Sequence, residues 1–424
     1  MIWHSEKASF GCWFLIKLID CEIRRNVFGL NQIQDHGLNK FLFFYMDSIR
    51  KQGSQFKGKQ TVPDKIIQSI SRRRFIKKTL LLSSGALGGM TGLTGLSGCG
   101  HHPDWPTPHI NDHFDGTHFS NIEPTRHKGA WAFFKAFFLE YHAEWPDHIP
   151  VADRREPPQR YGEEGIRYTY IGHATVLIQV DGINILTDPI WSERASPFTW
   201  IGPKRVRRPG LTIDQLPPID VILISHNHYD HLDMPTLIRL YETHHPLVLV
   251  GLGNASLLKE NGILKAQELD WWQHRNFGDL KLFFVPAQHF SGRSLSDRDK
   301  TLWGGFVVRT RYGNIYFAGD TARGRFLNMI SEKFGPMFLS FLPIGAFEPR
   351  WFMRPYHFDP RDAVHTHLEL QSTKSVGIHF GTFKLSLEGI DSPSRLLKSN
   401  LYNFDVDATR FHVPEFGVGY ELMS

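Results

Sequence analysis

The feature that most constrains this chain is an apolar run that ends in a loop crowded with histidine and aspartate. The segment reads Asp220-Val-Ile-Leu-Ile-Ser225, followed by His226-Asn-His228-Tyr-Asp230-His231-Leu-Asp233. Because residues two apart share a side of an extended loop, His226 and His228 can converge on one metal ion, while Asp230 and His231 face a second. Imidazole and carboxylate groups suit zinc, so these residues predict a binuclear metal site.

Three further candidate ligands directly follow predicted strands. They are His289 after Leu282–Val285, Asp320 after Ile315–Phe317, and His379 after Ser375–Ile378. Each of them alone could equally be a capping aspartate or a buried histidine satisfied by the core. The repeated order of strand and then ligand favours metal binding. No cysteine follows Cys99, so thiolate ligands are excluded from the main domain.

The segment from residue 161 to 424 is predicted to be the hydrolase domain, with an α/β fold of layered sheets. The other predicted strands are Arg167–Tyr170, Thr175–Val180, Ile183–Leu186, Val221–Ile224, Leu247–Val250, Gly305–Val308 and Phe338–Leu342. The predicted helices are Met234–Thr243, Ala255–Asn261, Thr321–Lys333 and Arg361–Leu370.

Residues 99–160 are expected to form an extension that packs on this domain. Within it, Lys128–Trp145 is predicted to be a helix with a large aromatic face. Core packing is the favoured interpretation of that face, and a lipid-binding surface is the alternative.

Residues 1–98 have the parts of a bacterial export leader. The segment Ser71-Arg-Arg-Arg-Phe-Ile-Lys77 carries a twin-arginine pair and precedes a glycine-rich apolar stretch. The stretch ends in Leu96-Ser-Gly-Cys99, which resembles a lipobox, and translation starting at Met46 would leave a leader of ordinary length. We therefore expect Tat export and a lipid anchor on Cys99 at the periplasmic or outer face of the cell envelope. The alternative is an exposed basic segment before a linker.

The charge of the chain is unevenly distributed. Residues 1–98 hold 15 Lys and Arg against 6 Asp and Glu, whereas the remainder holds 33 against 37. A mature chain without the leader is therefore mildly acidic, which argues against a nucleic-acid-binding surface.

The order HxHxDH followed by His, Asp and His resembles the metallo-β-lactamase superfamily. The resemblance implies a four-layer αββα sandwich with two Zn²⁺ ions at one rim. It also implies that one ion takes His226, His228 and His289, that the other takes Asp230, His231 and His379, and that Asp320 bridges them. The familiar β-lactamases place a cysteine on the second ion, so penicillin hydrolysis is not expected here.

A narrower resemblance rests on several short motifs in a fixed order. They are Gly172-His-Ala-Thr-Val176, Leu186-Thr-Asp-Pro-Ile190, Gly202-Pro-Lys-Arg205, Leu216-Pro-Pro-Ile-Asp220, Glu268-Leu-Asp-Trp-Trp272, Gly345-Ala-Phe-Glu-Pro-Arg-Trp-Phe-Met353 and His379-Phe-Gly-Thr382. Together they resemble the N-acylphosphatidylethanolamine-hydrolysing phospholipase D family over residues 110–420. That family implies release of phosphatidic acid and an N-acylethanolamine from a phospholipid, association with a membrane surface, and a homodimer.

The resemblance also suggests roles for residues outside the ligand set. Tyr356 and His357 stand where the family has a Gln-His pair near the substrate phosphate, although tyrosine departs from the pattern. Asp230 and His357 are the candidate catalytic residues; a surface histidine is the alternative for His357. Asp188 and Asp233 are expected to orient histidine ligands, and Asp188 could instead be a turn residue.

Two surface hypotheses remain open at this point. The basic loop with Lys204, Arg205, Arg207 and Arg208 either meets anionic headgroups or is a solvated charge run. The segment Trp351-Phe-Met353 either lines an acyl groove or packs in the core.

Rival functions also remain. A lactonase or a smaller phosphodiesterase would use the same two-metal scaffold, and a non-catalytic lipoprotein would only sequester zinc or a lipid. An RNA-processing nuclease is disfavoured by the acidic charge and the export signal.

Overall fold

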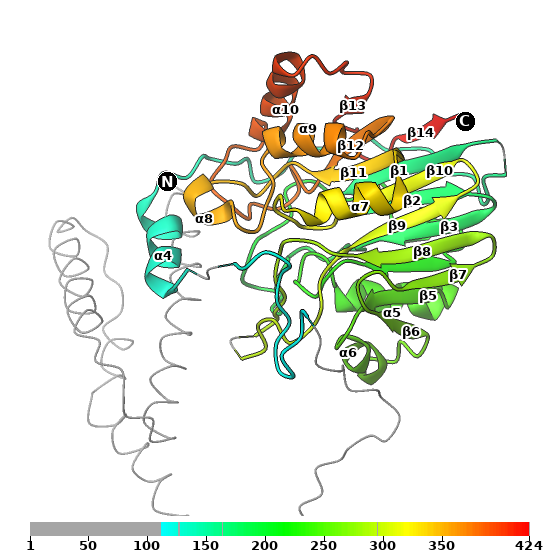
Figure 1. Ribbon diagram of the computed structural model, residues 1–424, viewed down its shortest axis with the longest axis horizontal. Helices are drawn as coiled ribbons and strands as arrows, with labels where there is room; N and C mark the ends of the chain where they lie inside the picture. Colours follow the sequence, from blue (N-terminus) through cyan, green and yellow to red (C-terminus); the bar gives the residue numbers. More distant parts are fainter. Residues whose placement is uncertain (1–111, 126–127, 163, 295, 424) are drawn as a thin grey trace, which may run out of the picture. The chain divides into compact units, whose positions relative to one another are not determined.

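The structure, a computed structural model, describes residues 112–125, 128–162, 164–294 and 296–423. The predicted leader, Met46 and Cys99 therefore lie outside the described residues. Two seven-stranded sheets form the centre of the fold (Figure 1). The first has the order β14-β1-β2-β3-β4-β5-β6. Its strands are β1 (Ile166–Gly172), β2 (Thr175–Val180), β3 (Ile183–Thr187), β4 (Val221–Ile224), β5 (Leu247–Gly251), β6 (Ala266–Leu269) and β14 (Gly419–Leu422).

The second sheet has the order β13-β12-β11-β10-β9-β8-β7. Its strands are β7 (His274–Phe277), β8 (Leu280–Val285), β9 (Gly305–Thr310), β10 (Gly313–Phe317), β11 (Met337–Pro343), β12 (Lys374–Ile378) and β13 (Phe411–His412). Both sheets are built alike, because an antiparallel meander in each is followed by three strands that extend the sheet in parallel.

The apolar runs are continuous because most strands are covered on both faces. In β4, the side chains of Val221 and Leu223 point into the core between the sheets. Ile222 and Ile224 point the other way, into a second cluster that contains Leu237 of the neighbouring helix. A strand with period-two geometry thus supplies two cores at once.

Helices cover the outer faces of both sheets. They are α5 (Met234–His244), α6 (Ala255–Glu260), α7 (Phe326–Phe334), α9 (Pro360–Glu369) and α10 (Ser392–Asn403), with a 3₁₀ turn η2 at Ile213–Gln215; the short helix α8 (Arg350–Met353) lies to the side, near the extension. Side chains of α5 and α6 pack on the first sheet, and those of α7, α9 and α10 pack on the other side of the core. In Figure 1, α5 and α6 lie below the sheets, and α9 and α10 lie above them. The predicted four-layer αββα architecture is confirmed.

The aromatic helix of the extension differs from the prediction. It is short, with α4 at Ala130–Phe134 and a π-helical turn η1 at Lys135–Leu139. Its phenylalanines are only half-buried and pack on one another, while Trp131 is 66% exposed. Phe133 and Phe137 also contact Phe352 edge-to-face, so this face is packed on the domain in part and exposed in part, and neither interpretation describes all of it. No helix in the described part of the chain is long and apolar enough to cross a bilayer.

The predicted helix Thr321–Lys333 also starts later, at Phe326. Ala322 forms a β-bridge with Gln288, and the Thr321 hydroxyl accepts a hydrogen bond from the Gln288 backbone N–H at 2.9 Å. These contacts hold the segment extended beside the loop that carries His289.

Candidate metal centre

Strand ends from both sheets meet at one rim and bring the predicted ligands together. The loop after β4 supplies four of them, and the residues after β8, β10 and β12 supply one each. All seven side chains lie in overlapping groups whose ligating atoms are within 4.8 Å of one another: His226, His228, Asp230, His231, His289, Asp320 and His379. Residues up to 153 positions apart in the sequence therefore share one site.

The first group contains three histidine rings. His226 Nε2 lies 2.8 Å from His228 Nδ1, and His289 Nε2 lies 3.3 Å from the same nitrogen. Three imidazole nitrogens that converge in this way have the ligand type and number of a catalytic zinc site.

The second group contains Asp230, His231 and His379. Asp230 Oδ2 lies 3.2 Å from His231 Nε2 and 3.3 Å from His379 Nε2. Asp320 lies between the two groups: its Oδ2 is 3.2 Å from His231 Nε2 and 3.9 Å from His289 Nε2. A carboxylate in this position can contact an ion in either group.

Contacts behind the rings fix their orientation. The Asp188 carboxylate is fully buried, lies 2.7 Å from His231 Nδ1, and accepts hydrogen bonds from the Ser225 N–H and hydroxyl. The His289 Nδ1–H donates to the Tyr356 carbonyl at 2.9 Å. Metal-binding histidines commonly use their second nitrogen in this way.

Asp233, which was expected to orient a histidine ligand, does something else. Its carboxylate accepts hydrogen bonds from the Ser192 hydroxyl at 2.8 Å and the Thr236 hydroxyl at 2.5 Å. Asp233 therefore fixes the loop after β3 to the start of α5. The expected role is corrected because the hydrogen-bond partners of this carboxylate are Trp191, Ser192 and Thr236, and none of them is a histidine.

The two groups differ in their electrostatics. Burial lowers the pKa of His228 to about 4 and that of His289 to about 3, so both rings are neutral near pH 7. Burial also acts on His379, but Asp320 and Asp230 outweigh it and raise the pKa of this ring to about 9. These two carboxylates therefore favour positive charge at the centre of the second group.

The residues fit divalent metal ions. His231 Nε2 and Asp320 Oδ1 are buried, and neither makes a hydrogen bond of good geometry among the described residues, although His231 Nε2 lies 3.2 Å from Asp230 Oδ2 and from Asp320 Oδ2 and Asp320 Oδ1 lies 3.1 Å from His379 Nε2. Buried polar atoms without partners are rare and costly. Both point at the centre of the ligand set, where a cation that accepts nitrogen and oxygen ligands would satisfy them. The His and Asp cluster is thus able to bind metal.

His357 and Tyr356 lie beside the first group. His357 Nδ1 is 3.9 Å from Asp320 Oδ2, and burial lowers the pKa of this ring to about 3. The Tyr356 ring packs on Phe290 with centroids 4.9 Å apart, and the Arg298 guanidinium lies 4.2 Å from the Phe290 ring. These side chains form a wall next to the ligands.

The basic loop divides into two kinds of residue: Lys204 and Arg208 are exposed, as expected for a solvated charge run, whereas Arg205 and Arg207 bind loop carbonyls. Arg205 is buried and donates to the carbonyls of Ile190 and Ser192, and Arg207 donates to the Gly381 carbonyl. These two guanidinium groups hold loops around the site together; Arg205 is buried, and Arg207 is partly buried.

Sequence reasoning missed Asn121 in the extension. Its side-chain amide donates to the His289 carbonyl at 2.8 Å, and its carbonyl oxygen accepts the His289 N–H at 3.0 Å. The partner lies 168 residues away, so no local pattern marks the contact. It also missed His173, whose Nε2 is 2.9 Å from Asp230 Oδ2.

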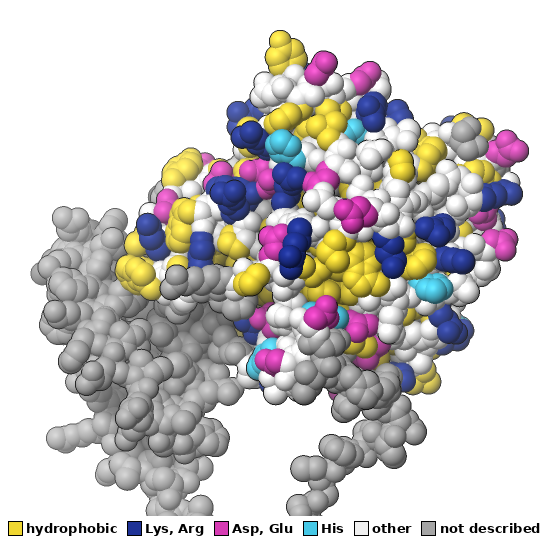
Figure 2. Space-filling model, in the orientation of Figure 1, with side chains coloured by type: hydrophobic (Ala, Val, Ile, Leu, Met, Phe, Trp, Pro, Cys, Tyr) yellow, Lys and Arg dark blue, Asp and Glu magenta, His cyan; other side chains and the backbone are white. Residues whose placement is uncertain are grey.

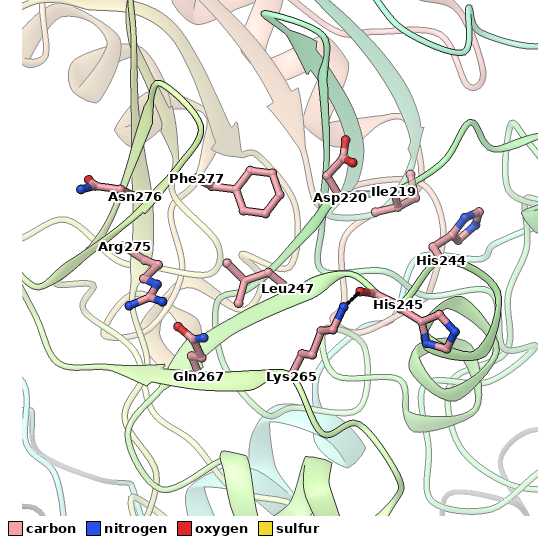
Figure 3. Close-up of a pocket in the computed structure, with 10 residues that line it drawn as sticks. All are labelled: Ile219, Asp220, His244, His245, Leu247, Lys265, Gln267, Arg275, Asn276 and Phe277. Atoms are coloured by element: carbon pink, nitrogen blue, oxygen red, sulfur yellow. Dashed lines mark hydrogen bonds between the residues drawn. The ribbon is translucent and has the colours of Figure 1, made fainter.

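A pocket of about 360 Å³ lies at the opposite end of the first sheet (Figure 3). Asp220, Leu247 and Lys265 line it, and these residues lie at the beginnings of β4, β5 and β6. The ligands follow strand ends instead, so this pocket is separate from the metal centre.

Comparison with known proteins agrees with this geometry. The model of the Beta-lactamase superfamily domain matches residues 183–380, a range that includes all seven ligands. The N-acyl-phosphatidylethanolamine-hydrolyzing phospholipase D 1 of Caenorhabditis elegans is 38% identical over 264 residues, which cover 58% of this chain and 73% of that protein.

Two more relatives extend the comparison. The mitochondrial N-acyl-phosphatidylethanolamine-hydrolyzing phospholipase D of Saccharomyces cerevisiae is 35% identical over 64% of this chain and 58% of its own length. A UPF0173 metal-dependent hydrolase of Koribacter versatilis is 30% identical over 55% of this chain and 91% of its own length. The chain is therefore a metal-dependent hydrolase that belongs to the beta-lactamase superfamily, in the family that includes the N-acyl-phosphatidylethanolamine-hydrolysing phospholipases D.

Proposed function

We propose that this hydrolase binds two Zn²⁺ ions and cleaves the phosphodiester of N-acylphosphatidylethanolamine-like phospholipids, releasing phosphatidic acid and an N-acylethanolamine. The observation that carries the proposal is the pair of ligand groups that share Asp320. The names of the relatives in C. elegans and S. cerevisiae support the substrate class.

The ligand set suits this chemistry. When bound, a pair of divalent cations supplies Lewis-acid polarisation of the phosphate and lowers the pKa of a nearby water. In the proposed reaction a water oxygen bonds to phosphorus, the bond from phosphorus to the ethanolamine oxygen breaks, and that oxygen takes a proton. The donors are nitrogen and carboxylate oxygen throughout, which favours zinc.

The protein positions the substrate through the wall beside the first group. The neutral ring of His357 can donate a hydrogen bond to a phosphate oxygen, and Asp320 lies within 3.9 Å of that ring. Asp230 is both a ligand and the partner of three surrounding histidines, so it sets the charge of the second group. The Tyr356 ring, on Phe290, provides an apolar surface next to the phosphate position.

Hydrolysis in ¹⁸O-labelled water tests the reaction. The purified protein is given N-acylphosphatidylethanolamine, unacylated phosphatidylethanolamine and a lactone in parallel, and products are identified by mass spectrometry. We expect ¹⁸O in phosphatidic acid and preference for the N-acylated lipid. Turnover of the lactone alone, or label in the alcohol product, would overturn the proposal. Asp320→Asn should lower kcat by roughly 10²-fold or more, whereas the exposed Asp214→Asn should not change it.

We also propose that the protein works at a membrane surface, through the aromatic face of α4, η1 and α8. Trp131, Leu139 and Trp351 are 66%, 62% and 40% exposed. The ammonium groups of Lys128 and Lys135 lie 4.9 and 5.1 Å from the Trp351 ring. Figure 2 shows hydrophobic side chains gathered beside basic ones over this part of the molecule. Exposed aromatics beside lysines suit the interface of an anionic bilayer.

This surface adjoins the metal centre. Arg350, at the start of α8, donates to the His357 carbonyl at 2.8 Å, and the His357 N–H donates to the Met353 carbonyl at 3.0 Å. A lipid entering from the bilayer would therefore meet α8 immediately before the phosphate-binding wall. Export and a lipid anchor on Cys99 form part of the same proposal, since both would hold the enzyme at the cell envelope.

Vesicle sedimentation tests the surface. In a Cys99→Ser background, which removes the proposed anchor, Trp131→Ala with Leu139→Ala should lower partitioning onto anionic vesicles by roughly tenfold or more. Tyr402→Ala removes an aromatic ring that is 87% exposed on α10 and serves as the control. Equal partitioning of the double variant and the control would contradict the proposed surface.

A further inference from the structure

His173 is a buried histidine whose ligating nitrogen lies within 4.8 Å of the ligating atoms of Asp230, His231 and His379, although it is not among the seven predicted ligands. It lies between β1 and β2 in the Gly172-His-Ala-Thr segment and is 1% exposed. Its backbone has φ of +58°, a left-handed conformation that is uncommon for residues other than glycine, although asparagine, aspartate and histidine adopt it more often than most. A strained and buried conformation of this kind persists only where the surrounding structure fixes it.

Three hydrogen bonds fix the His173 backbone. Its N–H donates to the Thr382 hydroxyl at 3.1 Å, and its carbonyl accepts from the His379 N–H at 2.7 Å and the Tyr170 hydroxyl at 3.1 Å. The His379 backbone is also left-handed, with φ of +59°. His173 therefore holds a ligand of the second sheet through its main chain.

The side chain of His173 holds a ligand of the first sheet. Its Nε2 lies 2.9 Å from Asp230 Oδ2, the oxygen that also faces His231 and His379 at 3.2 and 3.3 Å. A carboxylate oxygen has two lone pairs. A hydrogen bond from His173 occupies one lone pair of Asp230 Oδ2. The other lone pair is then directed at the position between the His231 and His379 rings.

We propose that His173 is a positioning residue for the second metal ion, which acts by donating an Nε2–H hydrogen bond to Asp230. The carboxylate rotates about its χ2 angle unless a donor fixes it, and this torsion is broad. His173 supplies that donor from a site rigidly connected to His379. One residue thereby sets the relative position of two ligands from different sheets.

The inference rests on the two-ion centre of the proposed function and is independent of the substrate. Two substitutions of His173 by amide residues, His173→Asn and His173→Gln, test the inference. Asparagine tolerates the left-handed backbone but is too short to reach Asp230, whereas glutamine can place an N–H donor near the position of Nε2. Zn²⁺ affinity is measured by competition with a chromophoric chelator, and the bound ions are counted by mass spectrometry.

We expect His173→Asn to weaken binding of the second ion by about 10–100-fold, the usual effect of removing a partner of a metal ligand. Binding of the first ion should stay unchanged, and His173→Gln should restore most of the second-site affinity. The visible spectrum of the Co²⁺-loaded glutamine variant should match that of the unaltered protein.

Two results would overturn the inference alone. The first is an unchanged second-site Zn²⁺ affinity in His173→Asn. The second is an equal loss of that affinity in both variants together with altered Co²⁺ spectra, which would make His173 a direct ligand. Far-UV circular dichroism and the melting temperature of the metal-free variants show whether each one folds. An unaltered protein that binds only one ion overturns the proposed centre together with the inference.

Discussion

At the residue scale, the metal centre separates into residues with a local sequence signal and residues without one. His226, His289 and Asp320 each follow an apolar strand, so their position in the sequence was enough to predict them as metal ligands. His173 also directly follows a strand, in the Gly172-His-Ala-Thr-Val176 motif, but the ligand on which it acts is 57 residues away; Asn121, which acts on a ligand 168 residues away, has no such signal. Their partners are set by how the strands pair and how the sheets stack, which a one-dimensional pattern does not contain.

Asp188 gives the sharpest prediction at this scale. Its Oδ2 accepts from the Ser225 hydroxyl and contacts His231 Nδ1 at 2.7 Å, with no exposure to solvent. Asp188→Asn would place an amide N–H₂ against one of these donors. We expect metal binding to weaken about 10–100-fold and the free energy of unfolding to fall by about 1–3 kcal/mol.

Urea unfolding and a zinc competition titration measure both effects. Asp214→Asn, on an exposed carboxylate that is paired with Arg239, serves as the control and should change neither quantity. Unchanged zinc affinity in Asp188→Asn would show that the contact with His231 does not support the centre.

At the element scale, the buried strands were predictable and the edge strands were not. Strands such as β2 and β4 are buried along their whole length, so their apolar runs reveal them. The missed strands include β7, whose residues are mostly exposed, and the two-residue β13. An edge strand is held by hydrogen bonds to the backbone of its one neighbour, and its side chains show little of the apolar pattern by which strands are predicted.

The end of β10 depends on a glycine. Gly319 has φ of +60°, and a Cβ at this position would lie 2.5 Å from the Ser225 Cβ. Gly319→Ala should therefore push β10 from β4 and displace Asp320, with loss of metal binding and of more than about 2 kcal/mol of stability.

Gly335→Ala is the matched control for that experiment. Gly335 has φ of +73°, but its added Cβ would meet nothing within 4 Å. The free energy of unfolding of this variant should fall only by the cost of a left-handed alanine backbone, about 1–2 kcal/mol, and the variant should keep its metal. Chemical denaturation and metal counting compare the two, and equal effects would show that the close approach to Ser225 is unimportant.

The extension is held to the sheets by a histidine between two carboxylates. His113 Nδ1 lies 2.8 Å from Asp112 and Nε2 lies 2.7 Å from Asp270. Burial lowers the pKa of His113, but the hydrogen bonds and charges of Asp270 and Asp112 outweigh it and raise the pKa above 6.5. A raised pKa stabilises the fold below the unfolded value near 6.5, and this contribution disappears as pH rises through the folded pKa.

His113→Gln should therefore destabilise the protein more at pH 5.5 than at pH 8.5. The difference is at most about 1 kcal/mol, because the Asp112 carboxylate is exposed and screened by solvent. Unfolding free energies of both proteins at the two pH values check this. A larger loss at the higher pH would contradict the sign of the pKa shift.

At the scale of the whole molecule, the metal centre joins two sheets of the same design. The first sheet supplies His226, His228, Asp230 and His231, and the second supplies His289, Asp320 and His379. The fold class was predictable because the order of strands and ligands is fixed along the chain. The common strand arrangement of the two sheets was not predictable, because it becomes visible only when the pairing of the strands is known.

A centre that spans both sheets should couple metal binding to stability. A ligand that binds only the folded state stabilises it by about 2.7 kcal/mol at 100 times its Kd. Chelation should therefore lower the melting temperature, and added Zn²⁺ should restore it in proportion to the logarithm of its concentration. Scanning calorimetry measures this, with Asp320→Asn as a variant whose response should be weaker. A melting temperature independent of chelator would contradict the coupling.

The number of metal ions in the folded, purified protein tests the central claim most directly. Elemental mass spectrometry after removal of loosely bound metal should find two zinc ions per chain. A single tightly held ion, or none, would contradict a centre built from two ligand groups around Asp320.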